Sequence, residues 1–200
     1  MSTTPMCISD ALISVLTFNY RAIRHVIGTE LGSVLRHPQK RHLDLGCGTG
    51  SLAPLFFAKG YVGVDISKSA ITRASARYKK YTFQQMDATH LQFPNKTFDT
   101  VLVIGVLHHL SDTAFRRAST EMARVLKPKG RALVIEAIPP LWKYNILGLL
   151  ARKMDAGDYI RTPLQYKNVL KQHFSIRRSY TVAGGIFDYA AFVLENKVKR

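Results

Sequence analysis

Three closely spaced glycines and three aspartates are the features of this sequence that point most clearly to a ligand-binding site. The stretch Leu43-Asp44-Leu45-Gly46-Cys47-Gly48-Thr49-Gly50 runs from apolar residues into glycines. Such a loop lets the backbone approach a ligand with no Cβ in the way. We expect a helix beginning near Ser51 to point its positive end at the same place. The pattern indicates a nucleotide-like ligand, although structural turns and dinucleotide-binding loops use similar glycines.

The aspartates favour a site unlike the usual dinucleotide site. Asp44 lies two residues before the first glycine, where a dinucleotide site usually has an apolar residue, and its carboxylate suits a ligand with an ammonium group. Asp65 ends the apolar run YVGVD, where it can accept hydrogen bonds from ribose hydroxyls. Asp87 ends a third run and can accept from an exocyclic adenine amine. With only 13 acidic residues in the chain, this placement is difficult to assign to solvated surface.

A parallel sheet would bring these residues to one edge. From Arg41 onward, short apolar runs alternate with longer amphipathic ones, which is typical of repeated strand–helix units. Ser67 and Asp112 are the expected N-caps of two helices, and Pro128-Lys129-Gly130 is the expected stop of the second. We expect strands at residues 42–45, 61–65, 81–87, 98–105, 131–138, 174–182 and 187–195, and helices at 51–59, 67–79 and 112–126.

The remaining segments complete one domain over residues 1–200. Only residues 183–186 separate the last two expected strands, which must therefore form an antiparallel hairpin, unlike the parallel ending of dinucleotide-binding folds. Residues 1–40 are interpreted as an N-terminal helical addition. Residues 139–173 form an insertion that leaves the carboxyl end of the fifth strand, where ligands bind in open sheets. We expect this insertion to form the pocket or lid for an acceptor.

The motifs LDLGCGTG, GVDIS, MDATHLQFPNKTFDTVLVIGVLHHL and EMARVLKPKGRALVIE resemble those of class I S-adenosylmethionine-dependent methyltransferases, of the small-molecule and quinone-type branch. The resemblance covers residues 41–138. Together with the pattern of strands and helices, it leads us to expect a single-domain, Rossmann-like α/β fold with a seven-stranded, mostly parallel sheet, a C-terminal antiparallel hairpin and helices on both faces. It also implies S-adenosyl-L-methionine as the cofactor.

The resemblance assigns residues to the methionine part of that cofactor. It implies that Asp44 and the loop of Gly46, Gly48 and Gly50 hold the methionine part. It also implies that the backbone at Gly105 and Val106 lines its other side. Cys47 completes the loop and is interpreted as a small residue that fits there, not as a nucleophile.

The adenosine part has its own implied residues. By the resemblance, Asp65 holds the ribose, and Asp87 holds the adenine together with the backbone of Ala88. Ile66 would pack on the adenine, although a position in the hydrophobic core explains an isoleucine equally well.

Two groups of residues could handle a proton. His108 and His109 follow the fourth strand at its carboxyl end, and imidazole suits proton transfer near neutral pH, with packing as the alternative role. Asp158 lies with Tyr159 and Arg161 in the insertion, where it could deprotonate an acceptor or belong to a local ion cluster. Methyl transfer from a sulfonium needs a base only when the acceptor must lose a proton. The other histidines have no ligand spacing, so no metal is expected.

Composition limits the class of protein. Two hundred residues, 46% of them hydrophobic, fit one globular domain. The net charge of +16 allows anionic small molecules, nucleic acid or acidic membranes as partners. There are only two cysteines, and no run approaches the roughly 18 apolar residues of a membrane span. We therefore expect a cytoplasmic protein with at most a peripheral membrane contact.

The favoured hypothesis is methyl transfer to a small, partly apolar metabolite, because the insertion contains the apolar stretch LWKYNILGLL. A membrane lipid or quinone is the first alternative, since Arg152 and Lys153 follow Trp142 in the same region. RNA is the second, because of the charge. Non-catalytic cofactor binding and a nicotinamide-dependent reductase are further alternatives, and the glycine spacing and hairpin ending disfavour the reductase. The acceptor atom and the oligomeric state stay open.

Overall fold

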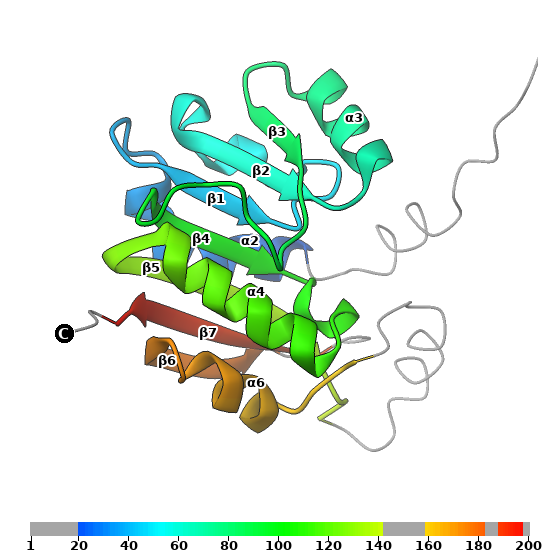
Figure 1. The fold of residues 1–200 in the computed structure, drawn as a ribbon, viewed down its shortest axis with the longest axis vertical. Coiled ribbons are helices and arrows are strands. Elements are labelled where there is room, and N and C mark those ends of the chain that lie inside the picture. The colour runs from blue at the N-terminus through cyan, green and yellow to red at the C-terminus, as the bar shows by residue number, and fades with distance from the viewer. Residues whose placement is uncertain (1–19, 142–158, 183–187, 198–200) are drawn as a thin grey trace, which may run out of the picture.

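The structure, a computed structural model, describes residues 20–141, 159–182 and 188–197. Its centre is a seven-stranded sheet in the order β3-β2-β1-β4-β5-β7-β6 (Figure 1). The strands are β1 (His42–Leu45), β2 (Tyr61–Asp65), β3 (Thr82–Gln85), β4 (Phe98–Ile104), β5 (Leu126–Ile138), β6 (Phe174–Val182) and β7 (Asp188–Asn196). This sheet confirms the expected fold class.

The first five strands are parallel, and their carboxyl ends share one edge of the sheet. β1 lies between β2 and β4, and β3 and β5 extend the sheet on either side. The residues of β4 from Thr100 to Val103 are fully buried because helices cover both faces. This order places the residues after β1, β2 and β4 next to one another at that edge.

The last two strands close the sheet in the antiparallel sense. β7 pairs with β5 on one side and with β6 on the other, both antiparallel. The pairing of β6 and β7 confirms the expected hairpin, whose connecting residues 183–187 lie outside the described residues. β7 is buried over most of its length, so the hairpin is part of the core.

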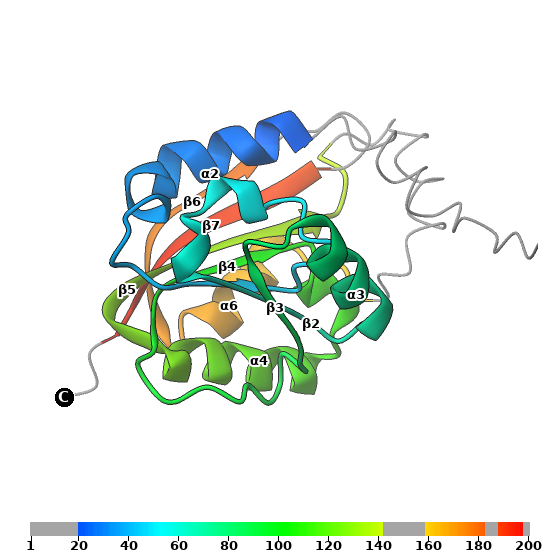
Figure 2. The ribbon, with the colours of Figure 1, turned by 90° about the horizontal axis from the view of Figure 1, so that it is seen from above.

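Helices lie on both faces of the sheet (Figure 2). α2 (Tyr20–Leu35) covers one face, where Ile27, Leu31 and Leu35 pack in a cluster with Leu102 and Leu133 of the sheet. α4 (Asp112–Val125) and α6 (Pro163–Leu170) cover the other face. α3 (Lys68–Arg77) packs against β2 and β3 and begins at its expected N-cap, Ser67, whose hydroxyl accepts from the Ala70 amide. None of the described helices is long and apolar enough to cross a membrane.

The expected helix at residues 51–59 is wrong. Two short 3₁₀-helical turns, Ala53–Leu55 and Ala58–Gly60, occupy this segment. Pro54 stands at the start of the first turn, and the ten residues between Gly50 and β2 leave no room for a helix that also returns the chain to the sheet. The positive end of an α-helix therefore does not contribute to the glycine loop.

Other boundaries differ by a few residues. The N-cap of α4 is Ser111 and not Asp112, because the Ser111 hydroxyl accepts from the Ala114 amide and Asp112 occupies the first turn. α4 ends before the expected stop, and β5 begins at once, so Pro128-Lys129-Gly130 lies inside a strand. A register shift between Phe98 and Thr100 accommodates this early pairing. The assignment of residues 1–200 to one domain stays a prediction.

Candidate functional site

The three glycines after β1 all have positive φ, but their surroundings differ. A Cβ on Gly46 would collide with a side-chain methyl of Val106, and one on Gly50 would come within 2.7 Å of the Phe83 ring. A Cβ on Gly48 would meet nothing within 4 Å. Gly46 and Gly50 therefore permit close packing inside the protein, whereas Gly48 alone faces open space.

Asp65 connects this loop to the end of β2. One carboxylate oxygen accepts a hydrogen bond from the Gly48 amide at 2.9 Å, and the other accepts from the Ser67 amide at 2.9 Å. Each oxygen can still accept from a second donor. Asp65 therefore has a double role, holding the glycine loop and offering lone pairs beside the open space at Gly48.

Asp44 is buried below the loop, with only 2% of its surface exposed. The Tyr61 hydroxyl donates to its carboxylate at 2.8 Å. Burial raises the pKa of Asp44 to about 7, and it also raises the pKa of Tyr61. Near neutral pH this carboxyl is therefore poised between its two states, and a cation nearby would favour the charged one. Burial likewise raises the pKa of the Cys47 thiol, so Cys47 has the character of a packing residue.

The expected adenine residues lie along the edge beyond β2. Ile66 is 68% exposed, so the alternative that it belongs to the core is wrong. Asp87 follows β3 instead of ending it, because the strand stops at Gln85. Its carboxylate accepts from the Thr89 amide at 2.7 Å and is exposed, while Ala88 is partly buried against the core.

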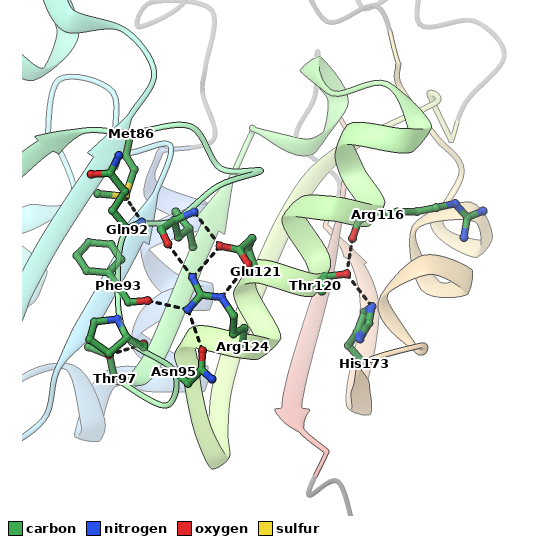
Figure 3. A network of polar contacts seen from close by, with 12 residues as sticks. Met86, Gln92, Phe93, Asn95, Thr97, Arg116, Thr120, Glu121, Arg124 and His173 are labelled. Atoms are coloured by element: carbon green, nitrogen blue, oxygen red, sulfur yellow. Dashed lines mark hydrogen bonds and ion pairs between the residues drawn. The ribbon is translucent and has the colours of Figure 1, made fainter.

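A network around Arg124 holds the loop that follows Asp87 (Figure 3). Arg124 of α4 donates to the carbonyls of Leu91 and Phe93 and to Glu121, whose carboxylate also accepts from the Leu91 amide. Apart from the Arg124–Glu121 pair within the helix, these contacts join the last turns of α4 to residues 91–95. The position of Asp87 and Ala88 thus depends on α4, a dependence that spacing in the sequence does not reveal.

The loop after β4 is organised by Glu136, a residue that the sequence analysis missed. Glu136 is fully buried in β5 and accepts from the amides of Val106, Leu107 and His108 at 2.8–3.3 Å. It also contacts Nδ1 of His108 at 2.8 Å. The single carboxylate within the apolar run RALVIEAI was the available signal, because a central strand seldom contains an unpaired acid.

The two histidines of this loop differ in environment. His108 is 5% exposed, whereas His109 is exposed to solvent, and their rings lie 4.1 Å apart between centroids. A Cβ on Gly105, where φ is +64°, would lie 3.6 Å from Cε1 of His108. The structure therefore places the His108 ring over the Gly105 backbone.

The described end of the insertion is attached to the same loop. The Tyr159 amide donates to the His108 carbonyl at 2.9 Å. Arg161, 6% exposed, donates to the carbonyls of Leu107 and Leu110 and makes an ion pair with Asp112. Asp155 and Asp158 lie outside the described residues. Among the residues described, Arg161 pairs with Asp112 of α4 and with the histidine loop, and the ion cluster expected within the insertion stays a prediction.

The sheet edge thus combines the open space at Gly48, the carboxylates of Asp65 and Asp87, and the histidine loop. Among the described residues, no group of three or more His, Cys, Asp and Glu side chains is placed to hold a metal ion. Residues 43–134 match the family model of a methyltransferase domain. Over these residues, a little less than half of the chain, the protein is similar to methyltransferases.

Similarity to known proteins extends over the same part of the chain. An uncharacterised methyltransferase of Bacillus subtilis, YcgJ, is 34% identical over 124 residues, which are 56% of this chain and 48% of that protein. A demethylmenaquinone methyltransferase of Thermotoga maritima is 35% identical over 111 residues, 54% of this chain and 48% of the relative. The crystal structure of a Pyrococcus horikoshii protein has a TM-score of 0.66 at 25% identity and covers 90% of this chain and 93% of its own. The chain spans about half the length of the curated relatives it matches.

Proposed function

We propose that this protein transfers the methyl group of S-adenosylmethionine to a small, partly apolar acceptor. The observation that carries the proposal is the open space at Gly48, which lies beside a carboxylate with unused lone pairs on Asp65. A bound nucleoside fills such a space and supplies the hydroxyl donors that the carboxylate lacks. The residues present therefore fit the cofactor that the domain family uses.

Each part of the cofactor has a matching group at the sheet edge. The proposed methionine contacts are the loop at Gly48, the backbone at Gly105 and Val106, and Asp44 from below, whose charged form a cofactor ammonium favours. Gly46 and Gly50 keep the loop close to Val106 and Phe83, so they support the site through packing.

The adenosine contacts follow the next two strands. We assign the ribose to Asp65, the adenine face to Ile66, and the adenine edge to Asp87 with the Ala88 backbone. The exposed side chain of Ile66 supports this assignment, since contact with a flat apolar base would remove most of that surface from water.

When bound, S-adenosylmethionine supplies an activated methyl group on a sulfonium. The protein residues contribute by orientation, because an in-line displacement gains most from holding the acceptor near the methyl carbon. His108, His109 and Asp158 are the proposed candidates for accepting a proton from the acceptor. The insertion excludes water from this region in our proposal, through its attachment to the histidine loop.

Apolar side chains support a partly apolar acceptor. Leu141 and Tyr159 are 50% and 44% exposed, and Leu164 at the start of α6 is 64% exposed. The Tyr159 amide is hydrogen-bonded to the histidine loop, so among these residues Tyr159 lies beside the proposed methyl position. The relative named a demethylmenaquinone methyltransferase makes a quinone or membrane lipid the second candidate acceptor.

Calorimetry with S-adenosylhomocysteine tests the cofactor site. Asp65→Ala should weaken binding about 10- to 150-fold, because it removes the ribose acceptor and leaves a loop amide unpaired. Asp99→Ala is the matched control, since Asp99 pairs with Lys40 and Lys127 at the opposite edge of the sheet. Unchanged binding in a folded Asp65→Ala protein would mean that Asp65 is only a loop anchor.

A transfer assay with methyl-tritiated S-adenosylmethionine tests the acceptor class. The protein is incubated separately with a metabolite extract, with vesicles containing phospholipid and quinone, and with total RNA. We expect label in the small-molecule fraction, depending on intact Asp65. Label in the vesicle lipids or in RNA would replace the metabolite with that acceptor class, and absence of transfer to all three would contradict the proposed activity.

A further inference from the structure

Glu136 is a charged group at a place where a protein seldom keeps one. Its side chain is fully buried within β5, in the centre of the sheet. Moving a carboxylate out of water is costly unless hydrogen bonds satisfy it. Glu136 obtains four such contacts, all from the three residues Val106 to His108.

The same loop is held from the opposite side through its carbonyls. Arg161 binds the carbonyls of Leu107 and Leu110, and the Tyr159 amide binds the carbonyl of His108. Glu136 and the end of the insertion therefore fix the backbone of residues 106–110 from both sides. The loop cannot shift without breaking contacts to β5 or to the insertion.

Glu136 also distinguishes the nitrogens of the His108 ring. A carboxylate 2.8 Å from Nδ1 favours a proton on Nδ1, and in the neutral imidazole this leaves the lone pair on Nε2. The ring lies over Gly105, on the proposed methionine side of the cofactor. His109 is exposed, and the described residues supply no carboxylate partner to its ring.

We infer that Glu136 is a positioning residue that makes His108, and not His109, the proton acceptor, so the methyl acceptor must be a group that loses a proton. This inference rests on the proposed function. It restricts the acceptor to hydroxyls, protonated or N–H-bearing amines and acidic carbons, and excludes acceptors such as thioethers and tertiary amines, which have no proton to lose.

The step balances without a further reactant. A lone pair of the acceptor atom forms the new bond to the methyl carbon while the carbon–sulfur bond breaks. The electrons of the broken bond go to sulfur, which becomes the neutral thioether. The acceptor proton passes to Nε2 of His108, giving an imidazolium whose charge Glu136 stabilises. The imidazolium then returns the proton to water.

Nitrogen-15 NMR of the histidine rings tests the positioning role without an acceptor. At pH 9 and with S-adenosylhomocysteine present, His108 should show its proton on Nδ1, with assignment by the missing signal in His108→Gln. In Glu136→Gln the amide oxygen can keep the Val106 and Leu107 amides, while the amide NH₂ donates to Nδ1. We therefore expect the tautomer to switch, with the proton on Nε2.

Transfer of the tritiated methyl group supplies the functional measurement. Glu136→Gln should transfer to the extract about 100-fold or more slowly than the wild type, while calorimetry finds S-adenosylhomocysteine affinity within about threefold. Glu136→Asp keeps a carboxylate and should restore part of the rate. His25→Gln, an imidazole-to-amide change on the exposed side of α2, is the control.

Two outcomes would overturn the inference: a wild-type His108 that has its proton on Nε2, or a Glu136→Gln enzyme that transfers at the wild-type rate. If Glu136→Gln does not fold, the wild-type tautomer and the rate of His108→Gln still decide it, and an unchanged rate in His108→Gln counts against it. Failure of the wild type to bind S-adenosylhomocysteine is a separate result. It would contradict the proposed function, and the His108 tautomer would then be a separate observation about the protein alone.

Discussion

Glycines of one short loop serve different purposes, and the atoms around each of them decide which. Gly46 and Gly50 have Val106 and Phe83 where a side chain would go, so they bring parts of the protein together. Gly48 has open space there, and its amide already binds Asp65. Of these three glycines, only Gly48 can therefore be substituted to test ligand contact without disturbing the packing of the protein.

Substitutions at these glycines should separate binding from folding. Gly48→Asn should weaken S-adenosylhomocysteine binding at least about tenfold and shift the thermal transition by only a few degrees, because asparagine tolerates positive φ. Gly46→Ala should instead destabilise the fold by about 1–3 kcal/mol through collision with Val106. Calorimetry and thermal unfolding check both. Full binding by Gly48→Asn would show that the loop is only a turn.

Asp44 gives cofactor binding a dependence on pH. Because burial raises its pKa to about 7, the carboxyl of the free protein is increasingly protonated below that pH. A ligand ammonium favours the charged form, so binding should release a proton. Affinity for S-adenosylhomocysteine should rise up to about tenfold between pH 6 and pH 8. Calorimetry in buffers of different ionisation enthalpy measures the proton, and Asp44→Asn should abolish both effects; an equal pH dependence in Asp44→Asn would place the titrating group elsewhere.

At the scale of elements, an arginine holds each end of α4. Arg124 joins its last turn to the loop after Asp87, and Arg161 joins its first turn to the histidine loop and the insertion. Each arginine binds more carbonyl groups than carboxylates. Several acceptors in different directions suit the forked donors of a guanidinium better than the single ammonium of a lysine. α4 thereby connects the adenine side of the site to the proposed acceptor side.

Replacement of Arg161 by lysine should reveal this connection. The substitution keeps the charge but cannot bind the carbonyls of Leu107, Leu110 and Tyr159 together with Asp112, and should cost about 1–3 kcal/mol of folding stability. Methyl transfer should fall, while S-adenosylhomocysteine affinity stays nearly constant. Denaturant unfolding, calorimetry and the tritium assay check this. Loss of cofactor affinity with normal transfer at saturating cofactor would assign the segment to the cofactor site instead.

Elements with strong local patterns could be predicted from the sequence, and elements set by distant contacts could not. β1, β2 and β6 have their expected bounds because apolar runs end in glycine, aspartate or turn residues. The helix expected at residues 51–59 is absent, since the connection is too short and contains Pro54. Glu136 lies 28 residues from His108 in the chain, so only the parallel neighbours β4 and β5 bring them together.

Across the described molecule as a whole, part of the positive charge lies far from the proposed site. A hollow of about 490 Å³ lies at the opposite edge of the sheet, beside the starts of β4 and β5. Its lining includes Lys96, Arg124 and Lys197 but no aspartate or glutamate. Nearby, Lys40 and Lys127 share Asp99, which lowers the pKa of that carboxyl to about 2. These five basic residues thus lie away from the proposed chemistry.

The stability of the whole fold should depend on pH through His42. This residue is fully buried in β1, neither ring nitrogen has a hydrogen-bond partner among the described residues, and burial lowers its pKa from 6.5 to about 4. Between these two pH values the unfolded chain binds a proton that the folded chain does not, so stability falls as pH falls.

Substitution by phenylalanine isolates this contribution. Phe56 and Tyr61 already form an aromatic cluster with His42, so the new ring fits the surroundings and removes two unpaired nitrogens. His42→Phe should therefore gain about 2 kcal/mol more stability at pH 5 than at pH 7.5, measured by denaturant unfolding at both. Asp44 acts in the opposite sense, because its folded pKa lies above its ordinary 3.8, and comparison of His42→Phe with the wild type cancels that effect. A gain that is equal at the two pH values would show that His42 remains neutral in the unfolded chain or is paired in the folded one, contrary to the structure.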